Sequence, residues 1–422
     1  MLFHMPHTTL SARRCRCISL AFGILLVLLV VVPAHAQASV LASDLVDGKT
    51  ASARAIPSAA LPSVTMKAGV LSDADGRLIW ARHPATPRAM ASITKIMTAV
   101  IALEHSKLTD MVTVPRAAAA VGQSSAYLFT GERLSMKDML GAMLVKSGND
   151  AALAIAIGVG GTEAHFVEMM NAKAAELGLK ETHFDNPHGL DAPGHHSSAR
   201  DLAVLARYAM QKPAFRGIVK KTSVKIGLPG HKHKLESTDL LLGNYKGAIG
   251  VKTGNTDHAG YSVVSAAVRS GVTLYAVVLG TVSDAQRFRD ASDLLDWGFA
   301  HYRPQSFLVS GTVIGEAPVT DYLDRAVAAG VSEDVTAAVL DTNGTIHRTI
   351  TIAPVRAPLK IGDHVGAVTF TQSGTLIAAA PLVAMRDVPS PNIFERVWIA
   401  LVRVWRWMFG SPKAQAALGF GT

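Results

Sequence analysis

The sequence predicts an α/β fold of the α+β type, in which a helical cluster packs against an antiparallel sheet over residues 63–301. Near the start of this region, two β-like runs flank the turn signal "DADG" and so predict a hairpin. Apolar residues then recur at helical spacing in several segments. From residue 244 onward the chain alternates β-branched and small residues, as the central strands of an antiparallel sheet do.

Residues 1–36 are expected to form a secretory signal peptide. Arginines precede the apolar run "ISLAFGILLVLLVVV", and the small residues Ala34 and Ala36 follow it, so we expect cleavage after Ala36. An uncleaved membrane anchor is the alternative, although the apolar run is short for a membrane span. In both cases the body of the protein is expected to be exported.

The cysteine count and the charge exclude several classes of protein. Both cysteines, Cys15 and Cys17, lie in the expected signal peptide, so the mature chain would have no disulfide, no thiol nucleophile and no cysteine-ligated metal. The same segment holds three arginines and no acidic residue, so its removal lowers the net charge from +9 to +6 (9 minus 3). This balance suits an anionic envelope or membrane surface, and no segment resembles a nucleic-acid-binding module.

The region between the signal peptide and the hairpin is predicted to be a linker. Residues 37–62 are rich in alanine and serine and contain Pro57 and Pro62, a composition typical of a spacer. The folded domain is therefore expected to start at Ser63.

Helices are predicted in the middle of this domain. "SITKIMTAVIALEHSK" places Ile96, Met97, Val100 and Ile101 at helical spacing, which indicates a deeply buried helix. "SMKDMLGAMLVKS" and "NDAALAIAIGVGG" predict two further helices, and "SARDLAVLARYAMQ" opens with residues typical of a capping box. After the strands, "DAQRFRDASDLLDWGFAHY" predicts a closing helix that covers the sheet.

Two further elements follow the main domain. Residues 302–388 contain short β-rich runs broken by Gly, Asp and Pro, which predict a small all-β sandwich with a structural or spacing role. Residues 389–410 predict a basic, aromatic amphipathic helix in the membrane interface, followed by a tail at 411–422. An ordinary core helix is the alternative, and a transmembrane span is disfavoured because Arg403 would lie in its middle.

The start of the buried helix holds a candidate nucleophile and base. Ser92 and Lys95 are three residues apart, so a helix would place the hydroxyl beside the amine. A lysine acts as a base only if burial or a nearby cation lowers its pKa. Alone, the pair is more often a helix cap followed by a solvated lysine, but this lysine lies in an apolar helix.

Two other segments could complete a site. In "SGN", Ser147 could pass a proton to a leaving group and Asn149 could hold a substrate amide, although such a tripeptide is commonly a plain turn. In "GAIGVKTGNT", Lys252 could lower the pKa of Lys95, and Thr253 could bind a substrate carboxylate.

The same strand could also hold the substrate backbone. Gly254 would let a peptide lie along the strand edge. The backbone N–H groups of Ser92 and Asn255 would then form an oxyanion hole for a tetrahedral intermediate.

Ser-x-x-Lys, Ser-x-Asn and Lys-Thr-Gly in this order resemble the penicilloyl-serine transferase superfamily of penicillin-binding proteins and serine β-lactamases. Within it, the chain is most similar to the low-molecular-weight D-alanyl-D-alanine carboxypeptidases of the peptidase S11 type, over residues 64–408. The stretches that carry this resemblance are "RAMASITKIMTA", "MLVKSGNDAA", "FDNPHGLDAPGHHSSARDLA", "VKTGNTDHAGYS", "APLKIGDHVG" and "PLVAMRDV".

The resemblance implies a β-lactamase/transpeptidase-like catalytic domain, a small β domain and a C-terminal anchoring helix on the outer face of the cytoplasmic membrane. It implies a serine hydrolase without a cofactor, which removes the terminal D-alanine from peptidoglycan stem peptides and is acylated by β-lactams. The residues it assigns are Ser92 as nucleophile, Lys95 as base, Ser147 and Asn149 as the second wall, and Lys252, Thr253 and Gly254 as the third.

Two positions depart from relatives, and one residue is assigned by similarity alone. Arg287 is similar to an arginine that some relatives use near the substrate carboxylate. Asn255 stands where many relatives have histidine, and "STDLLLGN" lacks an arginine that some carry. These departures concern the rate and the affinity for β-lactams, and leave the expected reaction unchanged.

Three alternatives were weighed against this interpretation. A β-lactamase shares all three motifs, but the Glu-Leu-Asn pattern of class A enzymes is absent between Asn149 and Lys252. A non-catalytic wall-binding protein would have no need for both Ser92 and Lys95. The histidines of "HFDNPHGLDAPGHH" lack a His-Glu-x-x-His helix, so no catalytic metal is expected.

Overall fold

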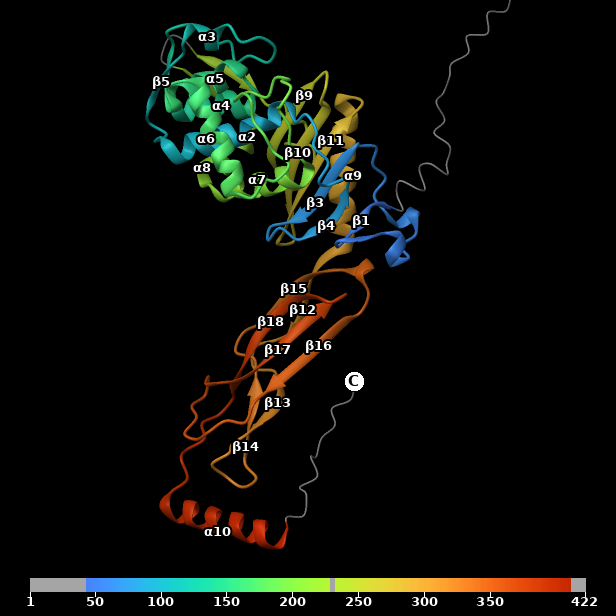
Figure 1. Ribbon diagram of the computed structural model, residues 1–422, viewed down its shortest axis with the longest axis vertical. Coiled ribbons are helices and arrows are strands. Elements are labelled where there is room, and N and C mark those ends of the chain that lie inside the picture. Colours follow the sequence, from blue (N-terminus) through green and yellow to red (C-terminus); the bar gives the residue numbers. More distant parts are fainter. Residues whose placement is uncertain (1–42, 228–231, 411–422) are drawn as a thin grey trace, which may run out of the picture.

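The structure is a computed structural model that describes residues 43–227 and 232–410. The predicted signal peptide, the first six residues of the predicted linker (37–42) and the predicted tail lie outside the described residues. Figure 1 shows a large mixed domain, an elongated β domain extending from it, and a helix at the far end. The predicted fold class is therefore confirmed.

The large domain is built on a seven-stranded antiparallel sheet with the order β2-β1-β4-β3-β11-β10-β9 (Figure 1). The hairpin predicted around "DADG" is present as β3 and β4. The strands are β1 (Leu45–Val46), β2 (Lys49–Thr50), β3 (Ala68–Asp73), β4 (Leu78–Arg82), β9 (Ala248–Thr256), β10 (Gly260–Arg269) and β11 (Val272–Thr281).

The prediction of a linker over 37–62 is wrong for the described part of that segment. From residue 43 the chain is folded onto the large domain, where Leu45 pairs with Ala81 and Val46 pairs with Trp80. Val46 is fully buried. Strands of two residues are too short to show an alternating pattern, so tertiary pairing places a segment whose composition indicates a spacer.

Helices cover both faces of the sheet. One face carries the helical cluster, with α2 (Lys95–His105) at its centre and all but the last turn of α2 buried. The other face carries α9 (Asp284–His301), the predicted closing helix. The remaining elements of the cluster are η3 (Ala91–Thr94), α3 (Arg116–Ala119), α4 (Met136–Val145), α5 (Asn149–Gly160), α6 (Glu163–Glu176), α7 (Ala199–Gln211) and α8 (Pro213–Val219), with two small hairpins, β5 (Met111–Thr113) with β6 (Arg133–Ser135) and β7 (Ser223–Ile226) with β8 (His233–Glu236).

The central strands of the large sheet have continuous apolar sequences because both faces of the sheet are buried. In β11, Val277 and Leu279 belong to the core beneath the helical cluster, whereas Ala276 and Val278 belong to the core beneath α9. Successive side chains of a strand point to opposite faces, so one strand serves two cores. The sheet is thus held rigidly between two layers, and its edge strand β9 is fixed in place.

The second domain is all β, as predicted. Its two sheets, β12-β15 and β13-β14-β18-β17-β16, share one apolar core that includes Val327, Val368, Phe370 and Leu382. The strands are β12 (Tyr302–Leu308), β13 (Val313–Pro318), β14 (Ala326–Gly330), β15 (Val335–Leu340), β16 (Ile346–Ile352), β17 (His364–Gln372) and β18 (Thr375–Ala384), with the short helix η4 (Asp341–Asn343) after β15.

The C-terminal helix α10 (Ile393–Phe409) starts at a capping box formed by Asn392 and Glu395. Two of its arginines contact the β domain, since Arg403 donates to the carbonyl of Thr320 and Arg406 pairs with Asp324. Within the described residues, no helix combines the length and the apolar character that a membrane span requires. The exposed surface of α10 is therefore mainly aromatic and aliphatic.

Candidate active site

The three predicted motifs meet at the β9 edge of the sheet, around a cleft of about 260 Å³. η3, the turn before α5 and β9 each form one wall. The cleft is lined by Ser92, Gln123, Ser124, Ser147, Asn149, Gly189, Leu190, Thr238, Thr253, Gly254, Asn255, Thr256 and Arg287. Lys95 and Lys252 lie behind this lining and are almost fully buried.

Ser92 lies in a 3-10 turn rather than in the first turn of an α-helix. η3 spans Ala91–Thr94, and α2 begins only at Lys95. Ala91 has a φ of 50°, in the left-handed region that is costly for alanine. The predicted spacing still brings the two groups together, because Lys95 Nζ lies 2.7 Å from Ser92 Oγ.

A charged Lys95 can donate to all three of its neighbouring oxygens, and a neutral Lys95 also fits these contacts if Ser92 is the donor. Lys95 Nζ contacts Asn149 Oδ1 at 2.7 Å and the carbonyl oxygen of His188 at 2.6 Å, and both of these atoms can only accept hydrogen bonds. A neutral amine has two N–H donors, which these two acceptors use. Its lone pair is then left for the third contact, the hydroxyl of Ser92.

The orientation of the Asn149 amide is fixed by its other end. Its Nδ2 donates to the carbonyl of Gly122 at 2.9 Å, so Oδ1 must face Lys95. The next residue, Asp150, is buried and accepts hydrogen bonds from the backbone N–H groups of Ala126 and Leu128. Asp150 thereby holds the loop that brings Ser124 into the cleft.

Burial and a like charge lower the pKa of Lys95. Desolvation of the fully buried amine is the largest cause, and the cation of Lys252 acts in the same direction. Asp150 opposes both effects by favouring the charged form. The pKa of Lys95 is thus well below its ordinary value, as a general base requires.

Lys252 is itself buried and contacts the second wall. Its Nζ donates to Ser147 Oγ and to the carbonyl of Thr253, both at 2.9 Å. Burial and the nearby Arg287 lower the pKa of Lys252 to about 7, against a weaker opposing effect of Asp239. Ser147 has a φ of 66°, a strained conformation that turns its hydroxyl into the site.

The remaining predicted residues of β9 also lie at the cleft. Thr253 Oγ1 lies 2.6 Å from Thr238 Oγ1, so the two hydroxyls form a pair. Gly254 packs against the turn that carries Ser92, since a Cβ there would lie 3.0 Å from the carbonyl oxygen of Met90. The prediction for Gly254 considered only the substrate backbone and missed this packing. Asn255 is exposed.

Arg287 reaches the site from α9 but is engaged with protein atoms. Its Nη1 donates to the carbonyl of Gly254 at 3.0 Å, and its Nη2 pairs with Asp284. Asp239 lies close enough to Arg287 and Lys252 for its charge to influence both. Arg287 therefore supports β9 and adds positive potential to the cleft, and a role at the substrate carboxylate stays a prediction.

Several residues of the site were not predicted from the sequence. His188 contributes only its backbone carbonyl to Lys95, and Thr238 acts through Thr253. The approach of the His188 loop depends on Gly189, because a Cβ there would lie 2.0 Å from the carbonyl oxygen of Ala91. The quoted stretch "NPHGLD" was the one available signal, and its glycine marks this close approach.

The histidines considered as metal ligands make structural contacts. His195 Nδ1 accepts from the backbone N–H of Asp185, so Nε2 carries the proton and donates to Thr94 Oγ1 at 2.7 Å. Thr94 in turn donates to the carbonyl of Ala91 at 2.8 Å. Burial lowers the pKa of His195 to about 4, so this neutral imidazole supports the turn that carries Ser92.

Replacing Lys252 with glutamine is expected to shift the acidic limb of the acylation rate to higher pH. The variant loses the like charge that lowers the pKa of Lys95, so Lys95 binds its proton up to a higher pH. Because the pKa of Lys252 is about 7, the change appears on the acidic side, where Lys252 is charged. The measurement is the rate of labelling by a fluorescent penicillin as a function of pH.

Lys246→Gln is the matched control, because Lys246 is exposed and lies two residues before the start of β9. It should leave the acidic limb unchanged. An unchanged limb in Lys252→Gln would contradict the proposed coupling of the two lysines.

Comparison with known protein families identifies this arrangement. A profile described as D-alanyl-D-alanine carboxypeptidase matches residues 55–283, which include every residue that lines the cleft except Arg287. The chain belongs to this family. A second profile, described as the C-terminal domain of penicillin-binding protein 5, matches residues 302–390 of this carboxypeptidase family member, and thus its all-β domain.

Individual relatives of this family member cover most of its length. D-alanyl-D-alanine carboxypeptidase DacC of Escherichia coli (strain K12) is 34% identical over 83% of this chain and 91% of its own. DacF of Bacillus subtilis (strain 168) is 31% identical over 76% and 85%. Penicillin-binding protein 5 of Haemophilus influenzae aligns in structure with a TM-score of 0.61 at 30% identity, over 78% of this chain and 99% of its own.

Proposed function

We propose that this protein is a serine-type D-Ala-D-Ala carboxypeptidase, which removes the terminal D-alanine from peptidoglycan stem peptides through an acyl-enzyme on Ser92. The set of contacts around Lys95 carries the proposal. In the neutral form of Lys95, its two N–H groups donate to Asn149 Oδ1 and the His188 carbonyl, and its lone pair is left for the Ser92 hydroxyl 2.7 Å away. In this arrangement Lys95 alone acts as the base that activates the Ser92 hydroxyl.

Acylation begins when Ser92 Oγ attacks the carbonyl carbon of the penultimate D-alanine and its proton passes to Lys95 Nζ. The C–O bond forms as the carbonyl oxygen becomes an oxyanion, which the backbone N–H groups of Ser92 and Asn255 stabilise. Ser147 then donates its hydroxyl proton to the leaving nitrogen and takes up a proton from Lys252, which donates a hydrogen bond to it. The C–N bond breaks, D-alanine leaves, and the acyl-enzyme remains.

Substrate selection follows from the positive charge behind the cleft. Lys252 and Arg287 are both close to the wall formed by β9, and Thr253 presents a hydroxyl there. The carboxylate of the terminal D-alanine binds in this region. Because β9 is an edge strand, the peptide backbone can align beside it as an additional strand.

Deacylation uses water, which regenerates Ser92 and releases the shortened peptide. Among the described residues, no aspartate or glutamate lines the cleft. After a β-lactam acylates Ser92, the acyl-enzyme would therefore have no carboxylate base in the cleft lining. Class A β-lactamases use such a base to hydrolyse their acyl-enzyme. This favours a penicillin-binding carboxypeptidase over a β-lactamase.

The reaction is tested by incubating the protein with a synthetic stem peptide that ends in D-Ala-D-Ala. We expect release of free D-alanine and of the shortened peptide, and no release from the matched peptide that ends in L-Ala-L-Ala. Peptide dimers in place of the shortened peptide would point to transpeptidation. Penicillin hydrolysis without D-alanine release would assign the site to a β-lactamase, and penicillin binding alone would indicate a non-catalytic wall protein.

The enzyme is proposed to work on the outer face of the cytoplasmic membrane, with α10 lying in the membrane interface. Trp398, Leu401 and Trp407 are largely exposed, although such residues are usually enriched in protein cores or interfaces. Two arginines of α10 contact the β domain, so the arginines contribute less to lipid binding than their number suggests. Apolar insertion is thus the main source of affinity.

The variants Trp398→Glu and Leu401→Glu are each expected to weaken binding to vesicles of zwitterionic lipid, by on the order of tenfold or more. Each removes an apolar side chain from the exposed surface of α10 and adds a charge. Co-sedimentation with vesicles at low and high salt measures the effect.

Val313→Glu is the control, because Val313 is an exposed apolar residue of the β domain outside α10. Binding that disappears at high salt and is indifferent to Trp398→Glu would show that charge, rather than apolar insertion, anchors the protein.

A further inference from the structure

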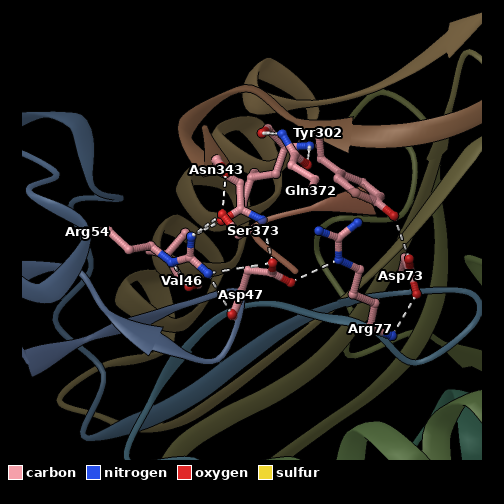
Figure 2. A network of polar contacts seen from close by, with 10 residues as sticks. Val46, Asp47, Arg54, Asp73, Arg77, Tyr302, Asn343, Gln372 and Ser373 are labelled. Atoms are coloured by element: carbon pink, nitrogen blue, oxygen red, sulfur yellow. Dashed lines mark hydrogen bonds and ion pairs between the residues drawn. The ribbon is translucent and has the colours of Figure 1, made fainter. Parts of the chain in front are cut away.

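Residues 43–54 contact both domains at their junction (Figure 2). The match to the carboxypeptidase profile begins at residue 55, directly after this segment. It contains β1, β2 and the short helix η1 (Ser52–Arg54).

On one side, the segment is anchored to the catalytic domain. Asp44 is buried and accepts two hydrogen bonds from the guanidinium of Arg82, at 2.8 and 2.9 Å. Asp47 Oδ1 accepts from Arg77 Nε at 2.9 Å. Together with the pairing of β1 and β4, these contacts make the segment part of the catalytic sheet.

On the other side, the segment holds the β domain through one arginine. Figure 2 shows the guanidinium of Arg54 directed at Asn343 and Ser373. Arg54 Nη1 donates to Asn343 Oδ1 and, at 3.3 Å, to Ser373 Oγ. Asn343 Nδ2 donates to Asp47 Oδ2, so Arg54, Asp47 and Asn343 form a closed set of polar contacts across the junction.

The partners in the β domain are themselves fixed. Asn343 is buried, and its carbonyl accepts from Ser373 Oγ at 2.6 Å. Gln372 is also buried and donates to the carbonyl of Leu340 at 2.7 Å and to that of Gly344 at 3.1 Å. The loop that Arg54 contacts is therefore tied to β17 on both sides of η4 and moves with the domain.

An apolar core also crosses the junction. Val46 and Ala51 from the segment, Leu295 from α9, and Tyr302 and Leu340 from the β domain belong to one buried cluster. Leu340 thus packs with the core of the catalytic domain rather than with that of its own domain. Figure 2 shows the hydroxyl of Tyr302 directed at Asp73, to which it donates at 2.6 Å.

We propose that residues 43–54 are an interdomain clasp, with Arg54 as its central positioning residue. The clasp holds the β domain at a fixed angle to the catalytic domain and so fixes the position of the cleft relative to α10. Its functional consequence rests on the proposed carboxypeptidase activity at a membrane. The rigid connection itself does not depend on that activity.

The rigidity is tested with Arg54→Ala in the protein without membranes. Since the chain has no cysteine after Cys17, the exposed pair Lys107→Cys and Arg348→Cys can carry spin labels, one on each domain. We expect a narrow distance distribution in the parent protein and a broad one in Arg54→Ala. An equally narrow distribution in the variant would overturn the proposal.

Arg303→Ala is the matched control, because Arg303 lies at the same junction but donates only to the neighbouring carbonyl of Ala300. Its distance distribution should remain narrow. Asn343→Ala removes the partner of Arg54 from the other domain and should broaden the distribution like Arg54→Ala. If Arg54→Ala fails to fold, Asn343→Ala still decides the question.

Activity measurements separate this proposal from the proposed function. Arg54→Ala should release D-alanine from a soluble pentapeptide at the parental rate, because the cleft is intact. On isolated cell-wall sacculi layered with membrane vesicles, its release should fall several-fold. Loss of rigidity with equal rates on both substrates would overturn the positioning role, and absence of activity in the parent protein would instead overturn the proposed function.

Discussion

Replacing Ser92 with alanine is expected to abolish both the release of D-alanine and the covalent labelling by penicillin. In the proposed reaction the Ser92 oxygen forms the acyl bond, and it lies 2.7 Å from the amine of Lys95. Loss of a serine nucleophile lowers turnover by about 10⁴-fold or more in enzymes that act through an acyl intermediate. The readouts are D-alanine release from the stem peptide and the mass of the protein after incubation with penicillin.

Ser106→Ala serves as the control for this variant. Ser106 follows the C-terminus of α2, and its hydroxyl donates only within the helix, to the carbonyl of Ala102. Both activities should be retained in it. A penicillin adduct on Ser92→Ala would show that another residue is the nucleophile.

Replacing Lys95 with glutamine is expected to slow acylation by about 10² to 10⁴-fold, the usual contribution of a general base. Glutamine can still contact Asn149 and the His188 carbonyl, but its amide nitrogen has no lone pair available for the proton of Ser92. Non-covalent binding of the substrate should change little. The rate constant of penicillin labelling at saturating concentration measures this effect.

Lys107→Gln is the corresponding control, because Lys107 is exposed just beyond the end of α2. It should label at the parental rate. Labelling of Lys95→Gln at that same rate would assign the proton transfer to another group, with Lys252 the nearest alternative amine.

The sequence alone predicted the part of the site whose residues are close together in the chain. Ser92 and Lys95 are brought together by three residues of helical chain, and the prediction survives even though the helix starts as a 3-10 turn. The motifs at Ser147 and Lys252 could be joined to this pair only by similarity to a family. Their meeting depends on long-range packing, which periodicity does not encode.

The features that were not predicted from the sequence depend on backbone atoms or on contacts between segments far apart in the chain. The carbonyl of His188 contacts Lys95 whatever its side chain, so residue type carries no signal of the contact. The segment at 43–54 was interpreted as a spacer because its strands gain stability from β4 rather than from their own pattern. The helix α10 was expected to be basic and amphipathic, but its pattern gives no sign that Arg403 and Arg406 contact the β domain.

The two buried lysines have a further consequence for the protein as a whole. Lys252 lowers the pKa of Lys95, and Arg287 lowers the pKa of Lys252, whereas no carboxylate lines the cleft among the described residues. Asp150, Asp239 and Asp284 partly offset this positive charge from behind the cleft. In the proposed function, a ligand that ends in a carboxylate adds a counter-ion from the open side. Because such a ligand binds only the folded protein, recognition of a free C-terminus is linked to the stability of the fold.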